Sequence, residues 1–221
     1  IVTDLDKDSS FVWNPVKSWP NHVLNAGNIR AVVRAWSLQQ PPDYMAIDLT
    51  IDGLAGLSFY PAAESVPGGI TSRLYKTEQL LMRRIPASNV KWRMGSPANE
   101  PGKSKGDKDG VLEIPHQVVL TEDYYLAVYP TTQLQYKRIM KTSTISNQAS
   151  GGSVTPSEDP DVTPIIRVGF ETLRGAGANY DWPTKTAVDG ASVVGTMRSR
   201  WPISAEFDLP TESQWEYACR A

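Results

Sequence analysis

The sequence predicts an α+β protein rich in turns and loops. First, segments 28–38 and 43–54 alternate apolar and polar residues in the way that strands with one buried face do. Second, segments 131–142, 184–200 and 211–220 carry apolar residues at helical spacing. Third, the 221 residues include 16 Gly, 17 Pro and 7 Trp, which favours many turns over a helical bundle.

Composition excludes several classes of function. Hydrophobic residues make up 40% of the chain, enough for a sizeable core, and the net charge of −2 gives no electrostatic signature of nucleic-acid binding. Apolar runs extend only a few residues, so we expect no segment that spans a bilayer. The single cysteine, Cys219, excludes an internal disulfide and a cysteine metal cluster within this chain.

Residues 1–80 are predicted to form a small antiparallel β module, either a sheet or a sandwich. Alternation marks strands in 28–38 and 43–54, and a further short strand is expected in 57–64. An apolar run follows within 76–87 and is ended by Pro86. One face of the second strand is expected to carry Met45, Ile47, Leu49 and Ile51.

Residues 81–221 are predicted to form a second, mixed region. Strands are expected from Val90, on both sides of a turn at 121–123, and in 163–170, with a long polar loop over 142–163. The helix in 131–142 is expected to start at a cap on Thr131 or Thr132. In the helix in 184–200, Arg198 and Arg200 lie in the last turn, where positive charges interact favourably with the helix dipole. The expected buried sides of these helices carry Leu134, Tyr136, Ile139, Met140, Ala187, Ala191, Val194 and Met197.

The last predicted helix has the clearest start signal. Thr211 follows Pro210, and Gln214 comes three residues later, which is the pattern of a capping box. Trp215, Ala218 and Cys219 then share one helical face. Because an apolar helix face has to be covered, we expect a protein partner or self-association through this helix if the rest of the chain leaves it open.

Four blocks in this order resemble one known family. They read "LMRRIPASNVKWRMGSPANEPGK", "IPHQVVLTEDYYLAVYPTTQLQY", "TPIIRVGFETLRG" and "FDLPTESQWEYACRA". Together they resemble the sulfatase-modifying-factor domain of the formylglycine-generating-enzyme family over residues 80–221, with the last block the most specific. The first 80 residues lie outside the resemblance.

The resemblance implies a variant of the C-type-lectin-like α+β fold. It also implies a candidate activity, the copper-dependent oxidation of a sulfatase cysteine to formylglycine, in which two cysteines hold the copper. Those cysteines and the calcium ligands belong to the second half of the family domain, so we interpret this chain as the first half. Pro130, Thr131, Gly169 and Phe170 depart from the family pattern and indicate a divergent member.

No residue of the chain is assigned a catalytic, cofactor-binding or metal-binding role. Cys219 is expected to be a small buried core residue, since free cysteines are mostly buried. His22 and His116 stand 94 positions apart and are interpreted as surface or hydrogen-bonded residues. Glu212 is expected to stabilise the N-terminus of its helix through the helix dipole, and Glu216 is expected to accept a structural hydrogen bond.

Two loop segments and a set of aromatic residues carry weaker functional signals. Segment 103–110 resembles part of a calcium loop without its bidentate Glu and is expected to be a solvated hairpin tip. The glycine-rich segment 174–183 is expected to be a turn. The aromatic residues of the N-terminal module are expected to be buried, and a carbohydrate-binding or protein-binding site is the alternative interpretation. They are Trp13, Trp19, Trp36, Tyr44, Phe59 and Tyr60.

The sequence is therefore compatible with three functions. The first is a non-catalytic binding or structural module, the second is part of an active copper-dependent oxidase, and the third is a lectin-like ligand-binding protein of the cell surface. No cofactor is expected in this chain, with copper and calcium dependent on ligands from the second half of the domain. The chain starts at Ile1 and the family is common among exported proteins, which favours the periplasm or the cell surface.

Overall fold

A computed structural model describes residues 41–97, 114–143, 159–176, 182–203 and 206–220. These residues belong to one compact unit of the chain, Leu38–Ala221. They contain helices and two antiparallel sheets, which confirms the α+β class.

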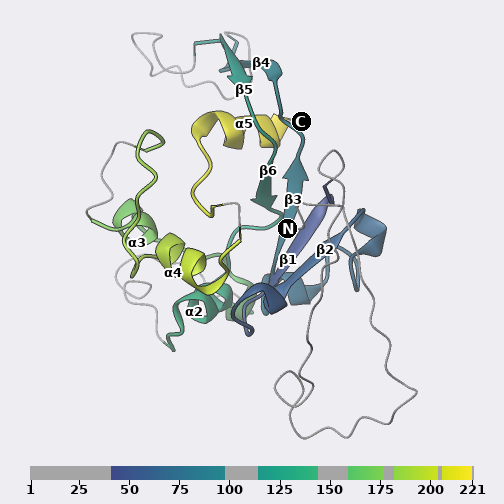
Figure 1. Cartoon of the computed structure of the whole chain (residues 1–221), viewed down its shortest axis with the longest axis vertical. Helices are drawn as coiled ribbons and strands as arrows, with labels where there is room; N and C mark the ends of the chain where they lie inside the picture. Colours follow the sequence, from purple (N-terminus) through teal and green to yellow (C-terminus); the bar gives the residue numbers. More distant parts are fainter. Residues whose placement is uncertain (1–40, 98–113, 144–158, 177–181, 204–205, 221) are drawn as a thin grey trace, which may run out of the picture. The chain divides into compact units, whose positions relative to one another are not determined.

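The larger sheet has four strands in the order β2-β1-β3-β6 (Figure 1). Its strands are β1 (Tyr44–Asp48), β2 (Leu57–Tyr60), β3 (Gln79–Ile85) and β6 (Tyr124–Ala127), and neighbouring strands are antiparallel. The boundary near residue 80 therefore falls inside β3, and the strands on either side of it belong to the same sheet.

Strand β1 is buried on both of its faces. Met45 and Ile47 pack into one hydrophobic cluster, and Tyr44 and Ala46 pack into another. Successive side chains of a strand point to opposite faces, so the two clusters lie on opposite sides of the sheet. The alternation predicted for Met45, Ile47 and Leu49 is confirmed, whereas Ile51 lies beyond the strand end and is 44% exposed.

Helices α2 (Gln133–Met140) and α4 (Val193–Arg200) cover the first of these faces. Ile139 comes from α2, Val194 and Met197 come from α4, and all three are buried with the strand residues. Trp201 has the largest fully buried side chain among the described residues, and it donates its indole N–H to the Ile51 carbonyl at 2.8 Å. The short helix α3 (Phe170–Arg174) adjoins α4.

The second face is covered by short 3₁₀ turns, η2 (Ala63–Ser65) and η3 (Arg73–Lys76), with Val66 and Tyr75 in its cluster. A polar residue of α2 reaches this region. Gln135 is 0% exposed, and its amide N–H groups bond to the carbonyls of Tyr75 and Gln79 at 3.0 and 2.8 Å. Two more 3₁₀ turns, η1 (Leu54–Gly56) and η4 (Pro160–Val162), lie in the connections.

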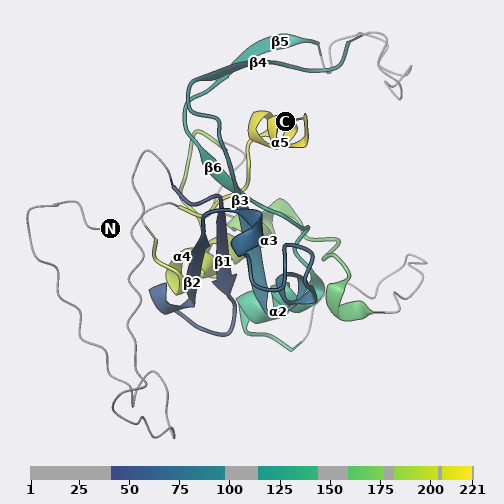
Figure 2. The same cartoon turned by 90° about the vertical axis from the view of Figure 1, so that its right-hand side faces the viewer.

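The smaller sheet is the hairpin of β4 (Val90–Met94) and β5 (His116–Leu120). Figure 2 shows the last helix, α5 (Glu212–Arg220), next to this hairpin. The predicted strand in 90–94 and the two strands around the turn at 121–123 are confirmed, although β5 pairs with β4 and β6 pairs with β3.

Two predicted elements are wrong in part. Segment 163–170 contains only an isolated bridge between Thr132 and Pro164, and its last residue, Phe170, begins α3 instead of ending a strand. The helix predicted over 184–200 begins at Val193, because the Ser192 hydroxyl accepts a hydrogen bond from the Gly195 N–H and caps it there. Within the described residues, every helix is too short or too polar to cross a membrane.

Candidate functional site

Helix α5 starts at the capping box that the sequence predicts. The Thr211 hydroxyl accepts from the Gln214 N–H at 3.2 Å, and the Gln214 side-chain oxygen accepts from the Thr211 N–H at 2.9 Å. Two N–H groups that have no partner inside the helix are thus satisfied. The capping residues Thr211 and Gln214 set the direction in which α5 leaves the preceding segment.

The inner side of α5 docks by polar and aromatic contacts. The Tyr217 ring lies 5.6 Å from the Trp92 ring of β4, and its hydroxyl donates to the Pro86 carbonyl at 3.2 Å. Glu216 accepts from the Gly95 N–H at 2.9 Å, which confirms its predicted role as a structural acceptor. Tyr124 of β6 donates its hydroxyl to the Gln214 carbonyl. The helix is therefore tied to both sheets.

The outer side of α5 carries the residues that the sequence analysis expected to be buried. Trp215 is 57% exposed, Cys219 is exposed and Ala218 is half-buried. The prediction of a buried Cys219 is therefore wrong. The reason is rotational: the chain docks α5 through Gln214 and Tyr217, so the Trp215 and Cys219 side chains of the same helix remain exposed.

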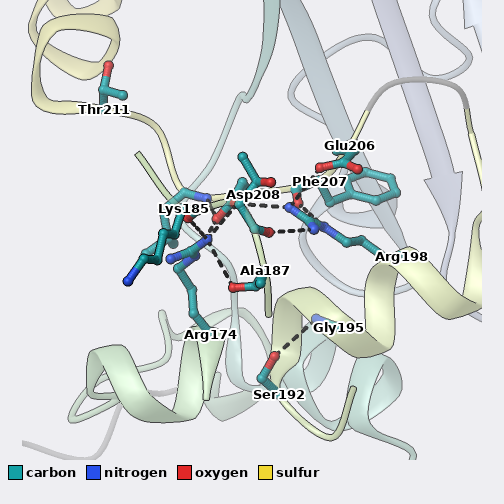
Figure 3. Close-up of polar contacts among 12 residues, drawn as sticks. Arg174, Lys185, Ala187, Ser192, Gly195, Arg198, Glu206, Phe207, Asp208 and Thr211 are labelled. Carbon is teal, nitrogen blue, oxygen red and sulfur yellow. Dashed lines mark hydrogen bonds and ion pairs between the residues drawn. The ribbon is translucent and has the colours of Figure 1, made fainter. Parts of the chain in front are cut away.

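A buried charge cluster lies just before α5. Asp208 accepts from the Nε of Arg174 at 2.8 Å and from Nη2 of Arg198 at 2.9 Å, and Figure 3 shows the two arginines approaching it from two sides. The side chain of Arg174 is 0% exposed and that of Asp208 is 10% exposed. The more exposed Glu206 adds a 3.3 Å contact to Arg198.

The same arginines also bind the backbone carbonyls of a separate segment, residues 185–187, and of Phe207 beside Asp208. Arg174 donates to the Lys185 carbonyl at 3.0 Å, and Arg198 donates to Thr186 and Phe207 at 2.9 and 2.8 Å. Four pieces of chain therefore converge at one carboxylate: α3, residues 185–187, α4 and the segment that enters α5. With both arginines already bound to protein groups, we interpret the cluster as a support for α5.

A third feature is a hollow of about 410 Å³ on the β4–β5 hairpin. Its lining comes from both strands and the residue before β5: Lys91, Trp92, Arg93, Pro115, His116 and Gln117. The ring Nδ1 of His116 lies 2.8 Å from the Ile114 carbonyl and therefore acts as the donor there, because a carbonyl only accepts. His116 is thus an exposed, hydrogen-bonded residue, as predicted.

The hydroxyl of Tyr124, which contacts α5, has a raised pKa. Desolvation by burial, followed by the proximity of Tyr217 and Cys219, raises the pKa of Tyr124 from 10.0 to about 12. The hydroxyl therefore stays protonated and remains a hydrogen-bond donor to α5 well above neutral pH.

The remaining candidates from the sequence lie apart. Glu212 sits in the first turn of α5, where a carboxylate favours the helix dipole. Tyr44 is buried, and Phe59 and Tyr60 pack against the two hydrophobic clusters, so these three do not form an exposed aromatic platform. His22, Trp13, Trp19, Trp36, segment 103–110 and part of segment 174–183 lie outside the described residues.

The arginines of the charge cluster, Arg174 and Arg198, were not predicted from the sequence to lie together. Arg174 and Asp208 are 34 positions apart, and no local pattern connects them. A signal did exist for the hairpin hollow, since Lys91 and Arg93 alternate with apolar residues along a predicted strand.

Residues 82–221 match a protein-family model, the Sulfatase-modifying factor enzyme 1-like domain. No curated protein and no solved structure matches the chain. The match begins within two residues of the start of the resemblance read from the four sequence blocks, which confirms the suspected domain.

Proposed function

The chain belongs to the family of the Sulfatase-modifying factor enzyme 1-like domain, and on that premise we propose that these 221 residues act as a non-catalytic binding or structural module. The observation that carries the proposal is the outer face of α5, where Trp215 is 57% exposed and Cys219 is exposed. We further propose that the α+β arrangement is the C-type-lectin-like variant that the family resemblance implies.

The donor set of the chain does not fit the copper site that the resemblance implies. That site takes two thiolates, whereas the sequence has one cysteine, Cys219, on the outer face of α5. Among the described residues, no group of three His, Cys, Asp or Glu side chains could hold a metal ion. A copper site of two thiolates therefore cannot form from the residues of this chain alone.

The outer face of α5 fits a second copy of the same chain. Tryptophan is enriched at protein interfaces, and an exposed Trp215 beside Cys219 offers apolar area that the docked side of the helix does not use. Glu212 lies in the first turn of α5 and Arg220 in the last turn. If two such helices pack antiparallel, the acidic end of each lies next to the basic end of the other. The positive end of each helix dipole then lies near the negative end of its partner's dipole, which is favourable.

Light scattering coupled to size-exclusion chromatography tests the association. We expect the wild-type chain to dimerise with rising concentration and Trp215→Ala to remain a monomer. Leu54→Ala is the matched control, because Leu54 is 63% exposed on η1, outside α5, and its loss should leave the dimer intact. A wild-type chain that stays monomeric at all concentrations, near its calculated mass of 24.4 kDa, contradicts the proposed interface.

A separate assay tests the absence of catalysis. The chain is incubated with copper(I) and a sulfatase-motif peptide, and the peptide aldehyde is sought by mass spectrometry. We expect no aldehyde above a control without protein. Turnover above that control would show that the chain is part of an active oxidase, which is the alternative function.

A further inference from the structure

The hairpin hollow carries two cations, Lys91 and Arg93, that form no ion pair with a carboxylate of the described residues. Lys91 and Arg93 are exposed on β4, and no carboxylate of the described chain forms an ion pair with either of them. By contrast, Arg73, Arg84 and Arg200 each bind an aspartate. Two basic side chains close together on one strand, with no ion pair to a described carboxylate, form a local positive potential.

The two cations share one face of the hairpin with residues of β5. In the strand register, Lys91 lies opposite Val119 and Arg93 lies opposite Gln117, and directly opposed residues point to the same side of a sheet. Val119 is 50% exposed. The outer face therefore combines positive charge, an amide and an exposed apolar side chain, while Trp92 packs on Tyr217 of α5.

The spacing of these groups matches an extended chain. Residues two apart on a strand are separated by about 6.8 Å, so Lys91 and Arg93 present their charges at the repeat of alternate residues in another strand. The hairpin has only two strands among the described residues, so each has an outer edge that neither strand pairs. Such an edge can add an extended peptide through main-chain hydrogen bonds.

We propose that the β4–β5 hairpin binds an extended acidic peptide segment of a partner protein, with Lys91 and Arg93 pairing with carboxylates on alternate residues of that segment. Gln117 donates or accepts a further hydrogen bond, and Val119 contacts an apolar residue of the peptide. This surface is distinct from the outer face of α5, so it extends the proposed function instead of resting on it.

Fluorescence anisotropy with a short labelled peptide in which Glu alternates with Val tests the proposal. We expect saturable binding to the wild-type chain, which weakens as the salt concentration rises from about 0.01 to about 0.15 M and the Debye length shortens. The double variant Lys91→Glu and Arg93→Glu should bind at least about tenfold more weakly, since both attractions become repulsions. The neutral double variant Lys91→Gln and Arg93→Gln should fall between the two.

Arg83→Glu is the matched control. Arg83 is an exposed arginine on β3 that lies outside the hollow, and its reversal changes the net charge as one of the two hairpin reversals does. Unchanged binding by Arg83→Glu and by Trp215→Ala supports the proposal. Three results would overturn it: no saturable binding of the peptide, equal weakening by Arg83→Glu, or full displacement of the peptide by inorganic phosphate at an equal concentration, which indicates a simple anion site.

Discussion

The guanidinium of Arg174 is completely buried, and its Nε lies 2.8 Å from the carboxylate of Asp208. A buried charge is tolerated when it is paired and hydrogen-bonded. Leu209 N–H also donates to Asp208 at 2.8 Å, which ties the pair to the chain that enters α5. The Arg174–Asp208 pair therefore connects the helical side of the core to the placement of the last helix.

Asp208→Asn should destabilise the fold strongly. The change removes the charge that compensates Arg174, and breaking one partner of a buried ion pair typically costs about 3–5 kcal/mol. The unfolding free energy is measured by urea titration. Glu206→Gln is the control, because this carboxylate is 65% exposed and such pairs contribute at most about 1 kcal/mol. Equal effects of the two changes would contradict the structural role assigned to Asp208.

Thr211→Ala should destabilise the chain by about 1 kcal/mol, because the hydroxyl that satisfies the Gln214 N–H is lost. Thr211→Ser keeps the hydroxyl and should restore most of the stability. The urea midpoints of the two variants are compared with that of the wild type. If serine and alanine destabilise equally, the capping hydrogen bond is not the cause.

Tyr217→Ala should cost more stability than Trp215→Ala. The Tyr217 change removes both the ring contact with Trp92 and the hydroxyl bond to Pro86, together worth roughly 1–3 kcal/mol. Trp215 is 57% exposed, and exposed substitutions usually stay within about 0.5 kcal/mol. The comparison is made at low protein concentration, where self-association does not contribute. A larger effect of Trp215→Ala there would show that α5 docks by its other side.

Stability should fall at high pH through Tyr124. Its folded pKa is about 12, above the ordinary value of 10.0, so the folded state favours the protonated hydroxyl. This contribution is fully present below pH 10 and is lost as the pH rises through the folded pKa. The stability of the wild type relative to Tyr124→Phe should therefore decline over that interval, measured by urea unfolding at a series of pH values. A difference that does not change with pH would contradict the raised pKa.

Local patterns in the sequence predicted the elements that depend on near neighbours. The capping box of Thr211 and Gln214 needs only residues three apart, and the burial of Met45 and Ile47 follows from alternation along one strand. The same reasoning failed at 163–170. There the β-branched and apolar residues suggested a strand, and the chain forms one bridge between Pro164 and Thr132.

Helical periodicity also identified a face without fixing its direction. Trp215, Ala218 and Cys219 do lie close together on α5, yet the helix turns Trp215 and Cys219 outward. The rotation is decided by Tyr217 and Gln214, whose partners Pro86 and Tyr124 are about 90 or more positions away in the chain. Contacts of that separation leave no trace in a local pattern.

The sequence by itself determined the α+β class, the family of residues 82–221, most strands and the start of α5, because these depend on alternation, caps and a specific motif order. Only the tertiary structure decided which side of α5 is buried, that Cys219 is exposed, and that Asp208 is shared by Arg174 and Arg198. These outcomes depend on charges and rings brought together from distant segments, where the cost of burying an unpaired charge selects the arrangement.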